Sequence, residues 1–106
     1  MTAESTLEFD EAGVARIGGP LTFDTCAQLY GAMEKKKPEG AALATIDLGG
    51  VTRIDSAGLA LLLEWQARHA SAGARLSMKN APRGLVQLAK LNNAVELLGL
   101  SGRNGA

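Results

Sequence analysis

The first residues of the chain alternate apolar and polar side chains in two short runs. Residues 7–10 (Leu-Glu-Phe-Asp) and 14–17 (Val-Ala-Arg-Ile) each predict a strand with one buried face. Glu11-Ala-Gly13 between them is typical of a tight turn, and Gly18-Gly-Pro20 is expected to end the second strand. The pattern therefore predicts an N-terminal β-hairpin.

A helical period follows the hairpin. The helix is predicted to start with Asp24 or Thr25 as its N-cap and to run to about Lys37, before Pro38 stops it. The residues expected on its apolar face are spaced three or four apart: Cys26, Leu29, Tyr30 and Met33.

The middle of the chain predicts a second strand–helix unit. Residues 41–46 form a continuous apolar run followed by Asp47-Leu48-Gly-Gly50, which predicts a strand that ends at Leu48 and is buried on both faces. The strongest helical pattern runs from Ser56 to about Ala72. Its expected core stripe is Leu59, Leu62, Leu63, Ala67 and Ala70.

The last third predicts one short strand at 75–78 and a helix from Pro82 or Arg83 to Leu91, with Leu85, Leu88 and Ala89 facing inward. Residues 94–98 are expected to form a final short helical turn, and 101–106 a frayed tail. The predicted fold class is α/β: a mixed, mostly parallel sheet with an N-terminal antiparallel hairpin and about four helices packed on it.

Length and composition indicate one globular domain spanning 1–106. The chain has 106 residues, of which 46% are hydrophobic and 21% charged. Eleven basic residues balance eleven acidic ones, so the net charge suggests neither nucleic acid nor a membrane as partner. Residues 1–64 carry a net charge of −5 and residues 65–106 one of +5. Either the folded molecule separates these opposite charges into two regions, or the two halves of the sequence mix in space and the charges cancel.

Cysteine content and hydropathy predict a cytoplasmic protein. Cys26 is the one cysteine and cannot form an internal disulfide, which suits a reducing compartment. The longest apolar run, 57–63, is far shorter than the roughly 20 residues of a spanning helix. The first five residues lack the features of a secretory signal.

Few residues suggest catalysis. One Cys and one His cannot make a Cys/His zinc site. Neither of the glycine-rich nucleotide-binding motifs, G-x-x-x-x-G-K-[ST] or a G-x-G-x-x-G that follows a strand, is present. His69 is expected at the surface, about 20 Å along the same helix from Ser56, too far for a Ser–His pair. Asp47 and Asp55 flank predicted strand ends, but no other group nearby in sequence would tune them as an acid–base pair. We therefore expect no enzyme, no cofactor and no metal.

The turn into the long helix carries most of the functional signal. Ser56 is predicted as the N-cap, and Asp55 adds negative charge where the helix dipole favours it. Gly58 in the first turn costs about 1 kcal/mol relative to Ala, which suggests a steric need for glycine. Ser56 is then expected to be exposed at the carboxyl edge of a parallel sheet, where open α/β folds bind ligands. The alternative is that Ser56 is an ordinary helix cap.

The segment from Ile46 to Leu59, I-D-L-x-x-V-x-x-I-D-S-A-G-L, resembles the signature of STAS domains, the fold of bacterial anti-sigma factor antagonists. The resemblance covers nearly the whole chain, from Gly19-x-Leu21 to Leu88-Ala-Lys-Leu91. It implies the STAS fold, and in the antagonists the serine matching Ser56 is switched by phosphorylation.

Within that family, Gly58-Leu-Ala-Leu-Leu-Leu63 and Leu88-Ala-Lys-Leu91-x-Asn93 look most like the MlaB-like STAS subunits of Mla phospholipid-transport ABC systems. That resemblance implies a cytoplasmic ATPase (MlaF-like) as partner, in a complex with an inner-membrane permease, and a location peripheral to that membrane. It places Ser56, with Asp55 and Gly58, at the turn that faces the partner.

The resemblance also assigns residues before and within the first helix. Tyr30 matches an aromatic position adjacent to the partner-facing surface, and Thr22, just before this helix, is also expected to bind the partner. Antagonists commonly have Asp where this chain has Thr22, a departure that weakens the sigma-pathway interpretation and leaves the transporter one unchanged.

Two interpretations remain open at this point. In the leading one, the turn at Ser56 and the helix bearing Tyr30 dock on the ATPase. Leu61 and Trp65 lie off the predicted core stripe and are expected to join that surface, with a core position as an equal alternative for Leu61. In the alternative, phosphorylation of Ser56 regulates binding to an anti-sigma factor serine kinase.

Overall fold

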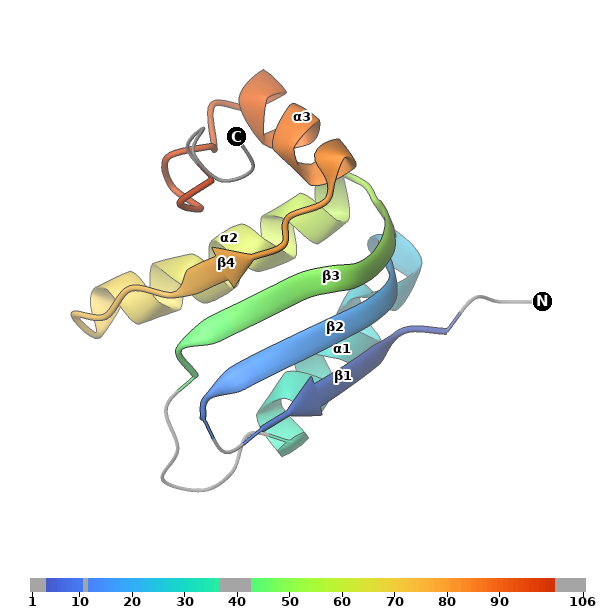
Figure 1. Cartoon of the computed structure of the whole chain (residues 1–106), viewed down its shortest axis with the longest axis vertical. Helices are drawn as coiled ribbons and strands as arrows, with labels where there is room; N and C mark the ends of the chain where they lie inside the picture. The colour runs from blue at the N-terminus through green and yellow to red at the C-terminus, as the bar shows by residue number, and fades with distance from the viewer. Residues whose placement is uncertain (1–3, 11, 37–42, 101–106) are drawn as a thin grey trace.

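In the computed structural model, which describes residues 4–10, 12–36 and 43–100, four strands form one sheet in the order β1-β2-β3-β4 (Figure 1). The strands are β1 (Thr6–Phe9), β2 (Val14–Leu21), β3 (Thr45–Ile54) and β4 (Ser77–Lys79). β1 pairs with β2 antiparallel, whereas the β2–β3 and β3–β4 pairs are parallel. The predicted mixed sheet with its N-terminal hairpin is thus confirmed.

Three helices belong to the described part of the chain: α1 (Phe23–Lys36), α2 (Ser56–Ser71) and α3 (Arg83–Leu91). Figure 1 shows α1 and α2 side by side on one face of the sheet. α3 lies past the edge of the sheet at which β3 and β4 end. About four helices were expected, but the segment 94–98 forms hydrogen-bonded turns in place of a helix. Leu98 N donates a hydrogen bond to Ala94 O at 3.1 Å, and the Leu98 side chain is buried, although no helix continues from this turn. The predicted tail at 101–106 lies outside the described residues.

The sheet is apolar on one face and polar on the other. Side chains toward the helices are buried: Leu7, Ala15, Ile17, Ile46 and Leu48. The prediction that the third strand is buried on both faces is wrong, because burial alternates along β3 from Thr45 on; residues 41 and 42 lie outside the described part. A strand covered by helices on one side alone needs apolar side chains at every second position.

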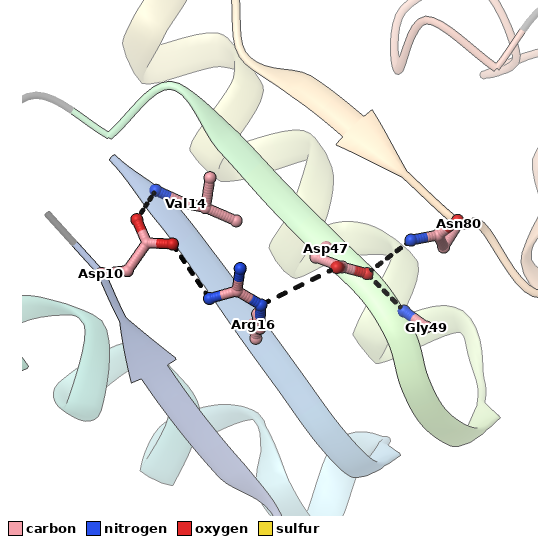
Figure 2. A network of polar contacts seen from close by, with 6 residues as sticks. All are labelled: Asp10, Val14, Arg16, Asp47, Gly49 and Asn80. Atoms are coloured by element: carbon pink, nitrogen blue, oxygen red, sulfur yellow. Dashed lines mark hydrogen bonds and ion pairs between the residues drawn. The ribbon is translucent and has the colours of Figure 1, made fainter. Parts of the chain in front are cut away.

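A polar network occupies the other face (Figure 2). Arg16 lies 3.0 Å from a carboxylate oxygen of Asp10 and 4.0 Å from one of Asp47. Asp47 Oδ1 also accepts hydrogen bonds from Asn80 Nδ2 at 3.0 Å and Gly49 N at 2.9 Å. These contacts connect the hairpin, β3 and the residue after β4 across the surface of the sheet.

β2 and β3 are both longer than predicted, because their glycines lie inside the strands. β2 continues through Gly18-Gly-Pro20 to Leu21, with register shifts against β3 on either side of Gly18-Gly19. Gly19 has φ +86°, and a Cβ there would be 2.4 Å from Glu4 O, so this bulge requires glycine. β3 likewise continues through Gly49-Gly50, where a Cβ on Gly50 would lie 3.1 Å from Ile17 O.

The buried face of α2 differs from the predicted stripe. Leu59 and Leu62 are buried as expected and Leu63 partly so, whereas Ala67 and Ala70 are exposed. In their place the helix buries Leu61, Trp65 and Gln66. Trp65 and Leu61 therefore belong to the core. The expectation that Trp65 lies on the docking surface is wrong, and of the two alternatives for Leu61 the core position is the one observed.

The remaining elements match the predictions with small shifts. α1 begins at Phe23, so Thr22 precedes it as N-cap, and neither Asp24 nor Thr25 caps the helix; its predicted end at Lys37 lies outside the described residues. Leu29 and Met33 are buried, and Cys26 and Tyr30 are partly buried. α3 spans the predicted residues and buries Leu85 and Ala89. Among the described residues, no helix is both long and apolar enough to cross a membrane.

Candidate protein-docking site

All three helices start at the edge of the sheet where β2, β3 and β4 end (Figure 1). Each of these strands leads into the helix that follows it, so the helix N-termini gather there. The last residues of β2 and β3, Leu21 and Ile54, are direct neighbours in register. The starts of α1 and α2 are therefore adjacent, and both contribute to the surface around Ser56.

Asp55 joins these two helix starts. It follows β3 in an extended conformation, with φ −130° and ψ −172°, and it is the N-cap of α2. Its Oδ1 accepts hydrogen bonds from Ala57 N at 3.0 Å and Gly58 N at 3.1 Å, and its Oδ2 accepts one from Phe23 N at 3.1 Å. A single carboxylate thus satisfies amides at the starts of both α1 and α2.

The same contacts shift the pKa of the Asp55 carboxyl. Burial alone would raise this pKa, but hydrogen bonds from the amides of Phe23, Gly58 and Ala57, together with the charge of Arg53, outweigh it and lower the pKa below its usual value. Asp55 is therefore ionised at neutral pH, as its capping role requires.

Ser56 is the first residue of α2 and its side chain is exposed. The prediction that Ser56 is the N-cap is wrong, because the extended residue that precedes the helix is Asp55. The expectation that Ser56 is exposed at the carboxyl edge of the sheet is confirmed. Since Asp55 supplies the cap, the Ser56 hydroxyl is not needed for that purpose.

Gly58 allows α2 to start against the end of β2. A Cβ at this position would lie 2.1 Å from Leu21 O and 2.9 Å from Leu21 Cγ, far closer than real contacts allow. The predicted steric need for glycine is confirmed, and Gly58 itself is buried. It fixes the position of the turn and leaves no side chain for a partner to contact.

Two other candidates from the sequence are buried. Thr22 is 6% exposed and Trp65 is 3% exposed. Thr22 O accepts hydrogen bonds from Thr25 N and Cys26 N, while Thr22 N donates to Thr25 Oγ1 at 3.1 Å. Thr22 thus organises the first turn of α1, and Trp65 fills the core beneath α2.

Tyr30 lies farther along the seam between α1 and α2 than the turn at Ser56. Its hydroxyl oxygen accepts a hydrogen bond from Arg68 Nη2, and the guanidinium carbon lies 5.2 Å from the centre of its ring. Arg68 also pairs with Glu64 at 2.9 Å and with Glu34 at 3.9 Å. Arg68 lies about 18 Å along α2 from Ser56. The Tyr30 hydroxyl, which Arg68 contacts, is therefore well separated from the turn at Ser56.

Phe23, the first residue of α1, was not among the candidates from the sequence. Its side chain is 78% exposed, and its backbone amide is the one held by Asp55. Because the sequence predicts Asp24 or Thr25 as the N-cap, the predicted helix starts two or three residues later and gives Phe23 no helical face. With the start at Phe23, the helical period places its side chain about 120° around the helix from the buried Leu29.

The other titratable candidates are not gathered in one place. Asp47 and Asp55 lie on one extended strand and its end, roughly 26 Å apart at the rise of a strand. Hydrogen bonds from Asn80 and the Gly49 amide lower the pKa of Asp47. Among the described residues, no three His, Cys, Asp or Glu side chains are grouped to hold a metal ion.

His69 is not simply a surface residue, contrary to the prediction. It is partly buried, and its ring nitrogens Nδ1 and Nε2 lie 3.0 Å from Trp65 O and Leu43 O, respectively. The ring thereby fastens the end of α2 to the residues before β3, which is a structural role.

Comparison with known proteins supplies the family. A family model described as "Mlab, STAS domain" matches residues 6–102. A search of curated proteins gives no match.

Solved structures match the fold at low sequence identity. A sulfate transporter family protein from Wolinella succinogenes matches with TM-score 0.64 and 23% identity, over 81% of this chain and 70% of that one. The anti-sigma factor antagonist SpoIIAA in its unphosphorylated form matches with TM-score 0.61 and 18% identity, over 83% of each chain. The murine anion transporter Slc26a9 matches with TM-score 0.59 and 14% identity, over 90% of this chain but 19% of the transporter. The fold and the family model, which covers nearly all of the sequence, together show that this chain belongs to the STAS-domain family.

Proposed function

We propose that this chain is a non-catalytic STAS subunit that binds the cytoplasmic ATPase of an Mla-type ABC transporter, a system that maintains phospholipid asymmetry in the outer membrane. The ATPase is MlaF-like and works with an inner-membrane permease, so the subunit is cytoplasmic and reaches the membrane through its partner. The match of residues 6–102 to the Mlab STAS model supports this transporter over other STAS settings.

The observation that carries the proposal is the exposed Ser56 side chain on a rigid turn. Asp55 holds that turn through three backbone hydrogen bonds, and Gly58 packs it against Leu21. A small hydroxyl held in this way allows a partner backbone to approach closely, and the turn loses little freedom on binding.

Replacement of Ser56 by Arg tests the docking surface. We expect Ser56→Arg to abolish co-purification with the ATPase, since a long charged side chain would separate the two surfaces, while the circular dichroism spectrum stays unchanged. Ser71→Arg is the matched control, because Ser71 is an exposed serine at the opposite end of the same helix. A complex that survives Ser56→Arg would rule out this surface as the contact.

A second candidate function is an antagonist regulated by phosphorylation of Ser56, with an anti-sigma factor serine kinase as partner. The exposed hydroxyl and the structural match to SpoIIAA favour it. A phosphate would add nearly two negative charges beside Asp55, whose carboxylate already occupies the amides of Ala57 and Gly58. The phosphate would therefore be repelled locally, and the surface would change sharply.

Incubation with such a kinase separates the two functions. Stoichiometric phosphate on Ser56, located by mass spectrometry of the digested protein, would favour the antagonist. A pull-down that recovers the ATPase from an unmodified chain would favour the transporter subunit.

A further inference from the structure

The four aromatic side chains of the chain differ sharply in exposure. Trp65 is 3% exposed, Phe9 and Tyr30 are partly buried, and Phe23 is 78% exposed. Isolated exposed apolar residues are common and need no explanation of their own. The position of Phe23 is what makes its exposure informative.

Phe23 and Ser56 are held by the same carboxylate. Phe23 N donates to Asp55 Oδ2, while the other oxygen of Asp55 caps the helix that Ser56 begins. Each of the two residues is the first of its helix. The residue that carries this exposed ring is therefore next to the Ser56 turn, and the same carboxylate holds the backbone of both.

Helical spacing extends this surface along α1. Phe23, Ala27, Tyr30 and Glu34 follow one another by four, three and four residues and so lie on one face. The buried residues of α1, Thr25, Leu29 and Met33, lie on another face.

The neighbouring α2 presents an exposed face of its own. It begins at Ser56 and continues through Ala60 to Glu64. Since α1 and α2 pack side by side, the two faces form one surface, which we call the α1–α2 face. Its members are Phe23, Ala27, Tyr30, Glu34, Ser56, Ala60 and Glu64.

The two halves of the α1–α2 face differ in chemistry. The half at the helix starts consists of Phe23, Ala27, Ser56 and Ala60, which are uncharged and, apart from Phe23, small. In the other half, Arg68 contacts Tyr30, Glu34 and Glu64. An uncharged, largely apolar area bordered on one side by polar residues that are already paired is compatible with a specific protein interface.

We propose that Phe23 is the aromatic anchor of the docking surface, and that the ATPase receives its ring in an uncharged apolar recess next to the segment that contacts Ser56. This inference rests on the proposed function and adds the chemistry of the partner surface. Aromatic side chains that become fully buried on association contribute most of the affinity of many interfaces. Trp65 cannot take this role, because it already lies in the core.

The test measures binding of the full chain to the purified MlaF-like ATPase encoded by the same genome, by calorimetry. We expect Phe23→Ser to weaken binding by about 30-fold or more, as removal of an interface hot spot does. Phe23→Leu should restore part of the affinity, because it returns apolar volume to the recess. Leu91→Ser is the matched control: Leu91 is 81% exposed on α3, outside the α1–α2 face.

The outcomes separate the anchor from the proposed function. Binding that is lost in Ser56→Arg but unchanged in Phe23→Ser would overturn the anchor and leave the function standing. Absence of binding by the unmodified chain would overturn both. A dimer of the chain alone that Phe23→Ser dissociates in analytical ultracentrifugation would assign the ring to self-association and also overturn the proposal. Thermal unfolding of each variant verifies that an exposed substitution leaves the fold intact.

Discussion

Within the turn Asp55-Ser-Ala-Gly58, neighbouring residues have separate tasks. Asp55 binds backbone amides of two helices, and Gly58 removes the Cβ that would collide with Leu21. Both act on the chain itself, which leaves Ser56 free to face a partner. The sequence located the turn correctly, but Asp and Ser are almost equally good N-caps, so residue type alone could not tell which one caps. The extended backbone of Asp55 decides the question.

The requirement for glycine at position 58 gives a prediction at this scale. We expect Gly58→Ala to lower the free energy of unfolding by about 2 kcal/mol, because overpacking against the β2 backbone costs more than the helix propensity of alanine returns. Urea unfolding followed by circular dichroism measures the change.

Gly31 provides the matched comparison. It lies within α1, and a Cβ there would have no neighbour closer than 4 Å. Gly31→Ala should therefore stabilise the protein by about 0.5–1 kcal/mol. Equal effects of the two substitutions would contradict the steric account of Gly58.

Among the secondary-structure elements, the sequence predicted type and order better than ends and faces. The amphipathic pattern of α3 identified its residues correctly, because its apolar and polar positions separate cleanly. The glycines of β2 and β3 were interpreted as strand ends, although tertiary pairing places them in bulges and close contacts between the two strands. In α2 the polar Gln66 concealed the true buried face, so the predicted stripe included Ala67 and Ala70 instead.

Gln66 is buried because it completes hydrogen bonds of the backbone before β4. Gln66 Nε2 donates to Leu76 O at 2.7 Å, and Leu76 N donates to Gln66 Oε1 at 2.9 Å. Gln66→Met keeps the volume of the side chain but leaves the buried Leu76 N and Leu76 O without their hydrogen-bond partner. We expect it to lower the free energy of unfolding by about 2–3 kcal/mol. Chemical denaturation measures the loss.

The matched substitution is Gln87→Met on the exposed side of α3, which should stay within about 0.5 kcal/mol of the unmodified chain. If Gln66→Met were as stable as this control, the side chain would not be holding β4 to α2. The comparison therefore tests a link between two elements that the apolar pattern gave no reason to expect.

Taken as a whole, the molecule has two unlike surfaces. One face of the sheet carries the polar network around Arg16 and Asp47 (Figure 2), and the α1–α2 face on the other side carries the candidate docking site. The opposite net charges of the two halves of the sequence do not separate in space at these contacts. Arg68, from the basic half, pairs with Glu34 and Glu64 of the acidic half. The interleaved arrangement therefore accounts for the contacts better than a polarised one.

Three carboxylates on these surfaces make the stability of the whole chain depend on pH. Hydrogen bonds lower the pKa of Asp10, chiefly the one from the amide of Val14, and the pKa of Asp47, chiefly the one from Asn80. The pKa of Asp55 is also lowered, although its burial acts in the opposite direction. A carboxyl whose pKa is lower in the folded state stabilises the fold fully above its unfolded pKa of about 3.9. That contribution disappears as the pH falls through the folded pKa. The free energy of unfolding should thus be level above about pH 5 and fall steeply below pH 4.

Asp55→Asn isolates the contribution of the turn to this acid sensitivity. Asparagine is also a good N-cap but does not titrate in this range, so the variant should lose less stability than the unmodified chain between pH 5 and pH 3. Asp10 and Asp47 remain and should sustain the rest of the decline. Urea unfolding at half-unit pH steps measures both curves. Parallel curves would mean that the Asp55 carboxylate gains nothing from the amides of Phe23, Ala57 and Gly58, whereas converging curves at low pH would locate part of the acid sensitivity at the point where α1 and α2 begin.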